Sequence, residues 1–268
     1  MTNGADLRAI RAFIFDMDGV IYRGKNALPG AASLIARLRR AAIPYLYLTN
    51  NSTTAPRDVA ERLRGMGIEA DAADIYTSAE ATAALLHEAM PGCRVLVIGE
   101  AGIRQALAAT GFTLVTDHRA ADAVVVGMDR EATYARLGEA SLAIQRGARF
   151  IATNLDASLP SEVGLIPGAG SLVGMLEIAS GRRAQAIGKP QPGIFRLALT
   201  RLGAIPKTTA CVGDRPETDI LGGQAAGLKT IAVLTGVGAR VDFESMQPPP
   251  DWIFEDLTTL EAAYFGEG

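Results

Sequence analysis

The sequence predicts an α/β protein whose strands lie mainly parallel. Short β-rich runs alternate with helix-patterned segments through most of the chain, as they do in proteins with parallel sheets. The clearest runs are residues 12–15, 45–48, 209–212 and 230–234. Three of these four runs end directly at a polar group, which is where open α/β sheets bind ligands. The pattern therefore indicates both the fold class and the edge of the sheet that carries a site.

Helices are predicted between the strands. Residues 57–66 place Val59, Leu63 and Met66 on one face, at the spacing i, i+4, i+7. Similar patterns predict helices at 132–146 and 171–180, and a helix rich in small residues at 220–226. A helix after each strand supplies the crossover connection that parallel strands require.

The middle of the chain has strands of its own, at residues 94–98, 123–126 and 149–152. Residues 80–183 are numerous enough to hold a separate core. They also stand between two groups of polar strand-end residues that must meet in one site. We therefore predict a Rossmann-like parallel-sheet core, residues 1–79 plus 184–268, with a smaller inserted α/β domain at 80–183.

Composition argues against several classes of partner. Hydrophobic residues make up 49% of the 268 residues, and the formal net charge is −3. This balance lacks the clustered positive charge expected for binding a nucleic acid polymer or a membrane surface. The two cysteines form no CxxC pair, and no apolar run approaches the ~18 residues that span a bilayer. We expect a soluble, cytoplasmic protein that acts on small molecules.

Two acids follow the first strand, in the motif Asp16-Met17-Asp18-Gly19. Alternate residues of an extended stretch point the same way, so both carboxylates can face one space. Acids this close repel each other unless a cation or a shared proton offsets the charge, which suggests a metal site. The alternative is a turn with two exposed acids.

Two further motifs supply groups that suit a phosphate ester. The Thr49 hydroxyl and the Asn50 backbone N–H follow the second strand and could bind phosphate oxygens. Lys189, between Gly188 and Pro190, offers a compact positive charge. Taken alone, the first motif is more often an ordinary N-capping turn, and the second is more often a solvated surface lysine.

The last motif, Gly213-Asp214-Arg215-Pro216-Glu217-Thr218-Asp219, follows the third strand. Magnesium prefers oxygen ligands, and Asp16, Asp214 and the Asp18 backbone carbonyl could provide them. Asp219 would then orient Lys189 or a metal-bound water. Phosphoryl transfer needs a nucleophile in line with phosphorus and positive charge on the equatorial oxygens. The four motifs together provide a candidate for each of these roles.

In this order, the four motifs resemble the signature motifs of the haloacid dehalogenase (HAD) superfamily. The insertion between the second and third motifs is similar to the C2-type cap of subclass IIA, the NagD-like, nitrophenylphosphatase and nucleotidase branch. Further matching stretches are residues 19–24, 153–156 and 167–171. The likeness covers nearly the whole chain.

The resemblance implies a magnesium-dependent phosphatase that acts on a small phosphorylated metabolite through an aspartyl-phosphate intermediate. It implies Asp16 as nucleophile, Asp18 as general acid and base, and magnesium held by Asp16, Asp18 and Asp214. It also implies Thr49, Asn50 and Lys189 as phosphate ligands. True dehalogenases of the superfamily lack the second aspartate, so the presence of Asp18 favours phosphoryl chemistry.

Several alternatives stay open at this point. A phosphotransferase or phosphomutase would share the intermediate, and a sugar-phosphate-binding regulatory protein would keep the site without turnover. Nucleoside monophosphates, phosphoglycolate, glycerol phosphate, pyridoxal phosphate and nitrophenyl phosphate all fit the resemblance. A homodimer formed through the cap is one option for the oligomeric state. Residues 154–171 either line the substrate pocket or form a structural loop, and we expect Asn154 and Asp156 to influence selectivity.

Overall fold

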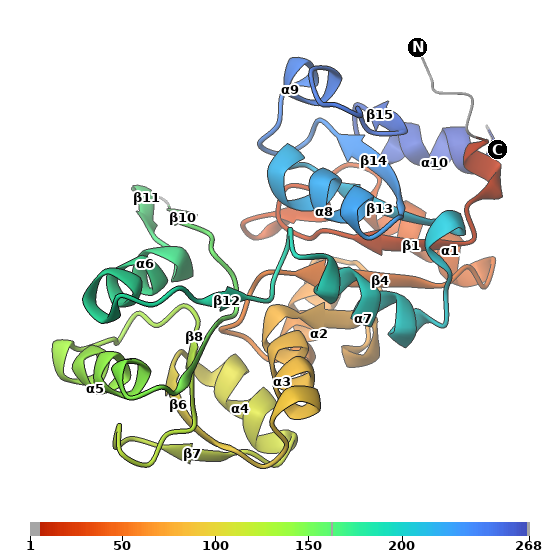
Figure 1. Ribbon diagram of the computed structural model, residues 1–268. Helices are drawn as coiled ribbons and strands as arrows, with labels where there is room; N and C mark the ends of the chain where they lie inside the picture. The colour runs from red at the N-terminus through yellow and green to blue at the C-terminus, as the bar shows by residue number, and fades with distance from the viewer. Residues whose placement is uncertain (1–5, 162, 267–268) are drawn as a thin grey trace. The chain divides into compact units, whose positions relative to one another are not determined.

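A computed structural model describes residues 6–161 and 163–266 of the chain (Figure 1). The chain divides into two compact units. The first comprises the described residues to Thr49, Arg57–Tyr76 and the residues from Lys189 onward. The second comprises Asn50–Pro56 and Thr77–Gly188. The divisions at 76/77 and 188/189 lie a few residues from the expected 79/80 and 183/184, and residues 50–56 group with the second unit.

The first unit is built on a six-stranded sheet in the order β15-β14-β13-β1-β4-β5. Its strands are β1 (Ala12–Phe15), β4 (Tyr45–Thr49), β5 (Ile75–Thr77), β13 (Thr209–Gly213), β14 (Lys229–Val233) and β15 (Trp252–Phe254). The pairings from β15 through β4 are all parallel. From β1 the chain builds outward through β4 and β5, and later through β13, β14 and β15 on the other side. The strand order therefore reverses between β1 and β13, the position where such sheets bind ligands.

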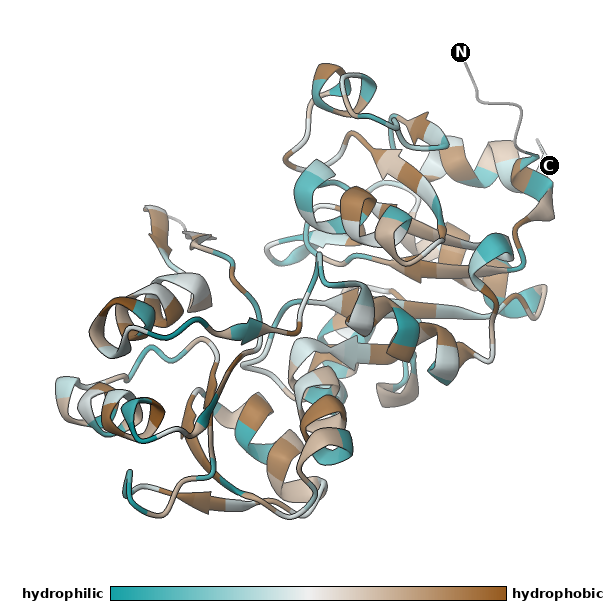
Figure 2. Ribbon diagram, viewed as in Figure 1, coloured by the Kyte–Doolittle hydropathy of each residue, from teal (hydrophilic) through white to brown (hydrophobic). Residues whose placement is uncertain are grey.

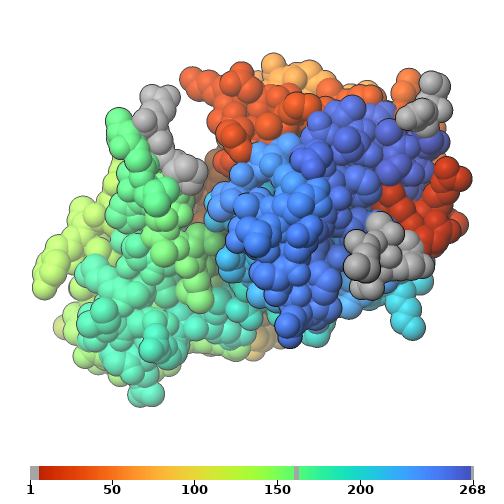
Figure 3. Space-filling model, turned by 90° about the horizontal axis from the view of Figure 1, so that it is seen from above, coloured from red at the N-terminus to blue at the C-terminus, as the bar shows by residue number. Residues whose placement is uncertain are grey.

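Helices cover this sheet, and a short hairpin follows its first strand. The helices are α1 (Ala31–Arg40), α2 (Pro56–Gly65), α7 (Pro192–Leu202), α8 (Leu221–Ala225), α9 (Arg240–Glu244) and α10 (Leu257–Phe265). The hairpin pairs β2 (Tyr22–Arg23) with β3 (Asn26–Ala27). The Tyr264 hydroxyl donates to the Ile10 carbonyl over 2.8 Å, so the first and last described segments of this unit lie side by side (Figure 3).

The strands of the first unit are apolar throughout because helices bury both faces of the sheet. Phe13 and Phe15 share one face of β1 with Tyr47 of β4, and Ile14 points to the other. The hydropathy colouring shows apolar residues gathered along these strands (Figure 2). Each large side chain buried in this way contributes about 1.5–3 kcal/mol to the free energy of unfolding.

The second unit holds a parallel five-stranded sheet in the order β12-β9-β8-β6-β7. Its strands are β6 (Arg94–Ile98), β7 (Thr113–Val115), β8 (Ala123–Val126), β9 (Arg149–Ala152) and β12 (Gln185–Ala186). Helices α5 (Tyr134–Gln145) and α6 (Ala169–Ser180) pack on one face through a shared apolar cluster. Helices α3 (Ser78–Ala89) and α4 (Ala101–Ala109) lie on the opposite face (Figure 1), and β10 (Ser158–Ser161) and β11 (Gly164–Pro167) form a hairpin.

The predicted α/β class is confirmed. The helix predicted at 220–226 is present as α8, Leu221–Ala225, and a π-helical turn that was not predicted (η4, Pro216–Ile220) leads into it. The turn places Asp219 where its side chain contacts Lys189, a requirement that local sequence does not express. Of the described helices, none is both long and apolar enough to span a bilayer.

Candidate active site

Asp16 and Asp214 each follow the last residue of a strand, and those strands are neighbours. Phe15 of β1 pairs with Val212 of β13, and the Asp16 backbone N–H donates to the Val212 carbonyl over 2.8 Å. Carboxylate oxygens of Asp16, Asp214 and Asp219 all lie within 4.8 Å of one another. The reversal of strand order between β1 and β13 thus brings together acids from distant parts of the sequence.

Lys189 lies between two of these acids. Its Nζ is 2.5 Å from Asp16 Oδ1 and 2.7 Å from Asp219 Oδ1, and its side chain is only 4% exposed. Burial opposes the charge of the ammonium, but the carboxylates of Asp16 and Asp219 outweigh it and raise the pKa of Lys189. The lysine therefore stays protonated and presents a fixed positive charge beside Asp16.

Asp219 uses both carboxylate oxygens within the protein. Oδ1 accepts from Lys189, and Oδ2 accepts from the Arg215 backbone N–H over 3.2 Å. Gly213 allows the close approach, because a Cβ at that position would lie 2.1 Å from the Asp219 Cβ. Because both oxygens are already bonded within the protein, Asp219 is suited to orienting Lys189 and not to binding a metal ion directly.

Asp214 has one oxygen bonded and one without a partner. Oδ2 accepts from the Val237 backbone N–H over 2.8 Å, while Oδ1 is buried without a hydrogen-bond partner among the described residues. A buried acceptor left unpaired costs about 1–3 kcal/mol, and more when it is charged. Burial and the charges of Asp16 and Asp219 raise the pKa of Asp214.

The donor set fits a divalent cation with oxygen ligands. Three carboxylates against one ammonium leave a formal charge of −2 in a buried site. The unpaired Asp214 oxygen and the Asp16 carboxylate are hard oxygen donors of the kind that magnesium prefers. A bound Mg²⁺ would neutralise this charge and provide a partner for the Asp214 oxygen.

Asp18 lies outside this group of three carboxylates. It is exposed, but desolvation by its surroundings and the charge of Asp16 raise its pKa, while nearby arginines partly offset the rise. A raised pKa favours the protonated form of this carboxyl, which is the form that a general acid needs.

Comparisons with known proteins agree with this geometry. A family described as haloacid dehalogenase-like hydrolase matches residues 13–113, and one described as HAD-hydrolase-like matches residues 186–260. The acid sugar phosphatase of Staphylococcus saprophyticus is 41% identical over 254 residues, covering 95% of this chain and 98% of the relative. The chain belongs to the haloacid dehalogenase-like hydrolases.

Solved structures refine this placement. NagD from E. coli is 36% identical, with a TM-score of 0.87 over 92% of this chain and 97% of that one. A glycerol phosphate phosphatase from Mycobacterium tuberculosis in complex with magnesium is 35% identical, with a TM-score of 0.89 over 96% and 78% of the two chains. The protein is a phosphatase of the NagD-like subclass IIA, as the sequence motifs predicted.

The two predicted phosphate ligands Thr49 and Asn50 fall on either side of the division between the units. Thr49 ends β4, the neighbour of β1. Asn50 is bonded within the second unit of the phosphatase, where its Nδ2 donates to both Asp156 oxygens over 3.2 Å and its carbonyl accepts from Asn154. Asn154 and Asp156 thus anchor the Asn50 turn, and the role of Thr49 and Asn50 toward phosphate stays a prediction.

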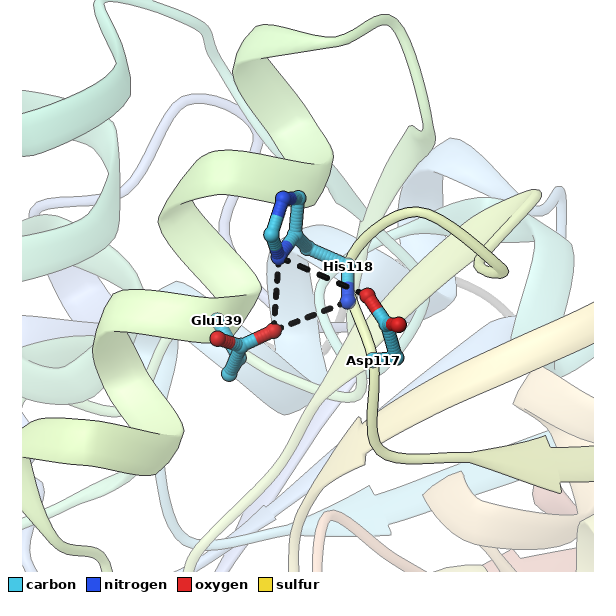
Figure 4. Close-up of side chains that lie close together, drawn as sticks. All are labelled: Asp117, His118 and Glu139. Carbon is cyan, nitrogen blue, oxygen red and sulfur yellow. Dashed lines mark hydrogen bonds and ion pairs between the residues drawn. The ribbon is translucent and has the colours of Figure 1, made fainter.

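The second unit of the phosphatase has its own cluster of ionisable side chains, formed by Asp117, His118 and Glu139 (Figure 4). His118 Nδ1 lies 2.8 Å from Glu139 Oε2, and the His118 backbone N–H donates to the same oxygen over 2.9 Å. These bonds lower the pKa of Glu139. They tie the loop after β7 to helix α5, which accounts for the cluster as a structural link.

The sequence singled out residues 19–24 but did not mark Arg62, or its contact with Tyr22 beside the site. Arg62 projects from the exposed side of α2, and its Nη2 donates to the Tyr22 hydroxyl over 2.5 Å. Its positive charge lowers the pKa of Asp18, against the larger effects that raise it. No local pattern marks an exposed helical arginine as a neighbour of a catalytic motif.

Proposed function

We propose that this enzyme is a magnesium-dependent phosphomonoesterase that hydrolyses small phosphorylated metabolites through an aspartyl-phosphate on Asp16. One observation carries the proposal. Asp16 lies at the reversal of strand order with Lys189 bonded to its carboxylate and Asp214 presenting an unpaired oxygen beside it. Sugar phosphates are the first substrate class to test, because the curated relative is an acid sugar phosphatase.

In the first half-reaction, the Asp16 carboxylate attacks phosphorus and an acyl-phosphate bond forms. Lys189 holds the attacking carboxylate and places positive charge beside it. The bond from phosphorus to the leaving oxygen breaks, and that oxygen takes the proton of the Asp18 carboxyl. Asp16, Asp18 and Asp214 would hold magnesium, which when bound supplies positive charge for the phosphoryl oxygens.

In the second half-reaction, Asp18 has lost its proton and acts as a base toward water. Water adds to the phosphorus, its proton goes to Asp18, and the bond between phosphorus and the Asp16 oxygen breaks. Inorganic phosphate leaves and both carboxyl groups return to their starting states. Lys189, fixed by Asp219, keeps Asp16 oriented through both steps.

The two units would divide the work. The motifs of the first unit are expected to contact only the phosphoryl group, which every candidate substrate shares. We therefore propose the first unit as the catalytic core and the second as a cap that controls access and selectivity. Asn154 and Asp156 would act on selectivity by fixing the Asn50 turn that both side chains contact.

The test is phosphate release from a panel of metabolite phosphates, before and after chelation of divalent metal. We expect release from sugar phosphates and nitrophenyl phosphate, loss of activity on chelation, and recovery on addition of magnesium. The thermal unfolding midpoint, measured in parallel, separates loss of metal from loss of fold. Full activity after exhaustive chelation would contradict the metal role. Transfer of phosphate to an added alcohol in place of water would favour a phosphotransferase.

A further inference from the structure

The backbone of Tyr22 holds both residues that flank Asp18. The Tyr22 N–H donates to the Met17 carbonyl over 3.1 Å, and the Tyr22 carbonyl accepts from the Gly19 N–H over 2.8 Å. These bonds form an isolated bridge between Asp18 and Tyr22. The backbone position of Asp18 is thus set by that of Tyr22.

The Asp18 side chain has little support of its own. It is exposed, and within residues 6–161 and 163–266 no hydrogen bond to its carboxylate is found. Its direction therefore depends on its backbone, and through the backbone on Tyr22. A displacement of about 1 Å of a reacting group can cost ~10²-fold in rate, so this support matters for any proton transfer by Asp18.

Arg62 fixes Tyr22 in two ways at once. Its Nη2 donates to the Tyr22 hydroxyl over 2.5 Å, and its guanidinium carbon lies 4.5 Å from the centre of the Tyr22 ring. Only a flat guanidinium combines a hydrogen bond to the hydroxyl with stacking on the ring. Tyr22 is only 6% exposed, so it is held both by packing and by Arg62.

The next residue holds the hairpin on its other side. Neighbouring residues of a strand point to opposite faces, so Tyr22 and Arg23 contact different parts of the first unit. The Arg23 guanidinium donates to the backbone carbonyls of Thr235 and Gly236, in the loop after β14. The hairpin that follows the nucleophile is therefore held from α2 on one side and from that loop on the other.

We propose that Arg62 is a positioning residue for the phosphatase reaction and acts through Tyr22 to keep Asp18 directed at the leaving oxygen. This inference rests on the proposed function of Asp18 as proton donor. In the step concerned, the bond from phosphorus to oxygen breaks, the leaving oxygen keeps the electron pair, and the Asp18 proton moves onto that oxygen. Removing Arg62 weakens this transfer without touching the nucleophile.

The experiment compares two substrates that differ in their need for a proton. Nitrophenolate leaves with little protonation, whereas the alkoxide of glycerol phosphate needs it. The kcat/KM ratio of glycerol phosphate to nitrophenyl phosphate is measured for wild type, Arg62→Met, Arg62→Lys and Tyr22→Phe. Asp18→Asn gives the full effect of losing the proton donor, and Arg57→Met, an exposed arginine on the same helix, is the matched control.

We expect Arg62→Met to lower the ratio about tenfold, within the ~10²–10⁴-fold range available to general acid catalysis. Tyr22→Phe should lower it in the same direction, and the double variant should not add the two effects, because both break one chain of contacts. Arg62→Lys should lower the ratio less than Arg62→Met does, since lysine keeps the positive charge but lacks the planar guanidinium. Arg57→Met should leave the ratio unchanged.

The outcomes separate this inference from the proposed function. If Asp18→Asn lowers the ratio and Arg62→Met leaves it unchanged, the positioning role is wrong and the function of Asp18 stands. If Arg57→Met lowers the ratio as much as Arg62→Met, the effect is one of surface charge and the inference is also wrong. If Asp18→Asn leaves the ratio unchanged, the proton-donor role on which both rest is wrong. Unfolding midpoints of all variants show whether a loss reflects folding instead.

Discussion

Each unit of this phosphatase contains a cluster of three side chains that could bind a metal ion, and the two clusters differ in their surroundings. In the first unit, the side chain of Asp16, which follows buried strand β1, is 13% exposed, and that of Asp219, in the turn η4, is 0% exposed. In the second unit, the side chains of Asp117 and Glu139 are 56% and 40% exposed, on a loop and a helix. Residue type alone does not distinguish them.

The difference is one of uncompensated charge. Water screens the exposed acids of the second unit, and His118 satisfies Glu139 directly. The acids of the first unit are desolvated, exceed the positive charge beside them, and leave one Asp214 oxygen without a partner. A cation or a phosphate ester with its metal would relieve this imbalance. Buried charge that the protein does not balance by itself therefore distinguishes the candidate site from the structural link.

The comparison is tested most strongly by removing one acid from each cluster. Asp16→Asn should lower kcat by about 10⁴–10⁶-fold, because it removes the nucleophile, and no phosphoenzyme should form. Glu139→Gln, its counterpart in the second unit, should leave kcat unchanged. Phosphate release and rapid-quench mass spectrometry measure both. A phosphorylated Asp16→Asn protein would place the nucleophile elsewhere.

A second test adds one methyl group in each unit. A Cβ at Gly236 would lie 1.8 Å from Asp214 Oδ2, so Gly236→Ala must displace that carboxylate. Displacing a group that orients a ligand typically costs 10–100-fold in metal affinity, and we expect the magnesium concentration for half-maximal activity to rise by about that factor.

The matched control is Gly138→Ala in helix α5, where an added Cβ meets nothing within 4 Å. We expect it to leave the magnesium requirement unchanged and to raise the free energy of unfolding by about 0.5–1 kcal/mol, because alanine favours the helix. An unchanged magnesium requirement in Gly236→Ala would argue that Asp214 is not a metal ligand.

The smallest effect is expected from His118→Ala. This change removes the contact of the imidazole with Glu139, keeps the bond from the backbone N–H, and leaves the buried site intact. We expect an unchanged kcat and a fall in the thermal unfolding midpoint of less than about 4 °C, since partly exposed ion pairs contribute little. A loss of phosphate release from this variant would mean that the second cluster has more than a structural role.

Much of the fold and of the site could be predicted from the sequence. Strands buried on both faces read as continuous apolar runs, so β1, β6, β8 and β9 were predicted with the residues they occupy. Asp16 and Asp214 come after such runs, and Lys189 stands between a glycine and a proline, where a helix cannot easily continue. Asp219 closes the motif that contains Asp214. These positions marked the four residues as candidates. Short elements such as β15 escaped prediction because three residues show no periodicity.

The tertiary structure decided how these residues meet. It placed β1 beside β13, put Lys189 between Asp16 and Asp219, and left Asp18 outside the group of three carboxylates. It also joined Arg62 to Tyr22, which no sequence pattern connects. The reason is physical: a sequence carries local periodicity and residue chemistry, whereas desolvation and the pairing of distant charges exist only once the strands have assembled.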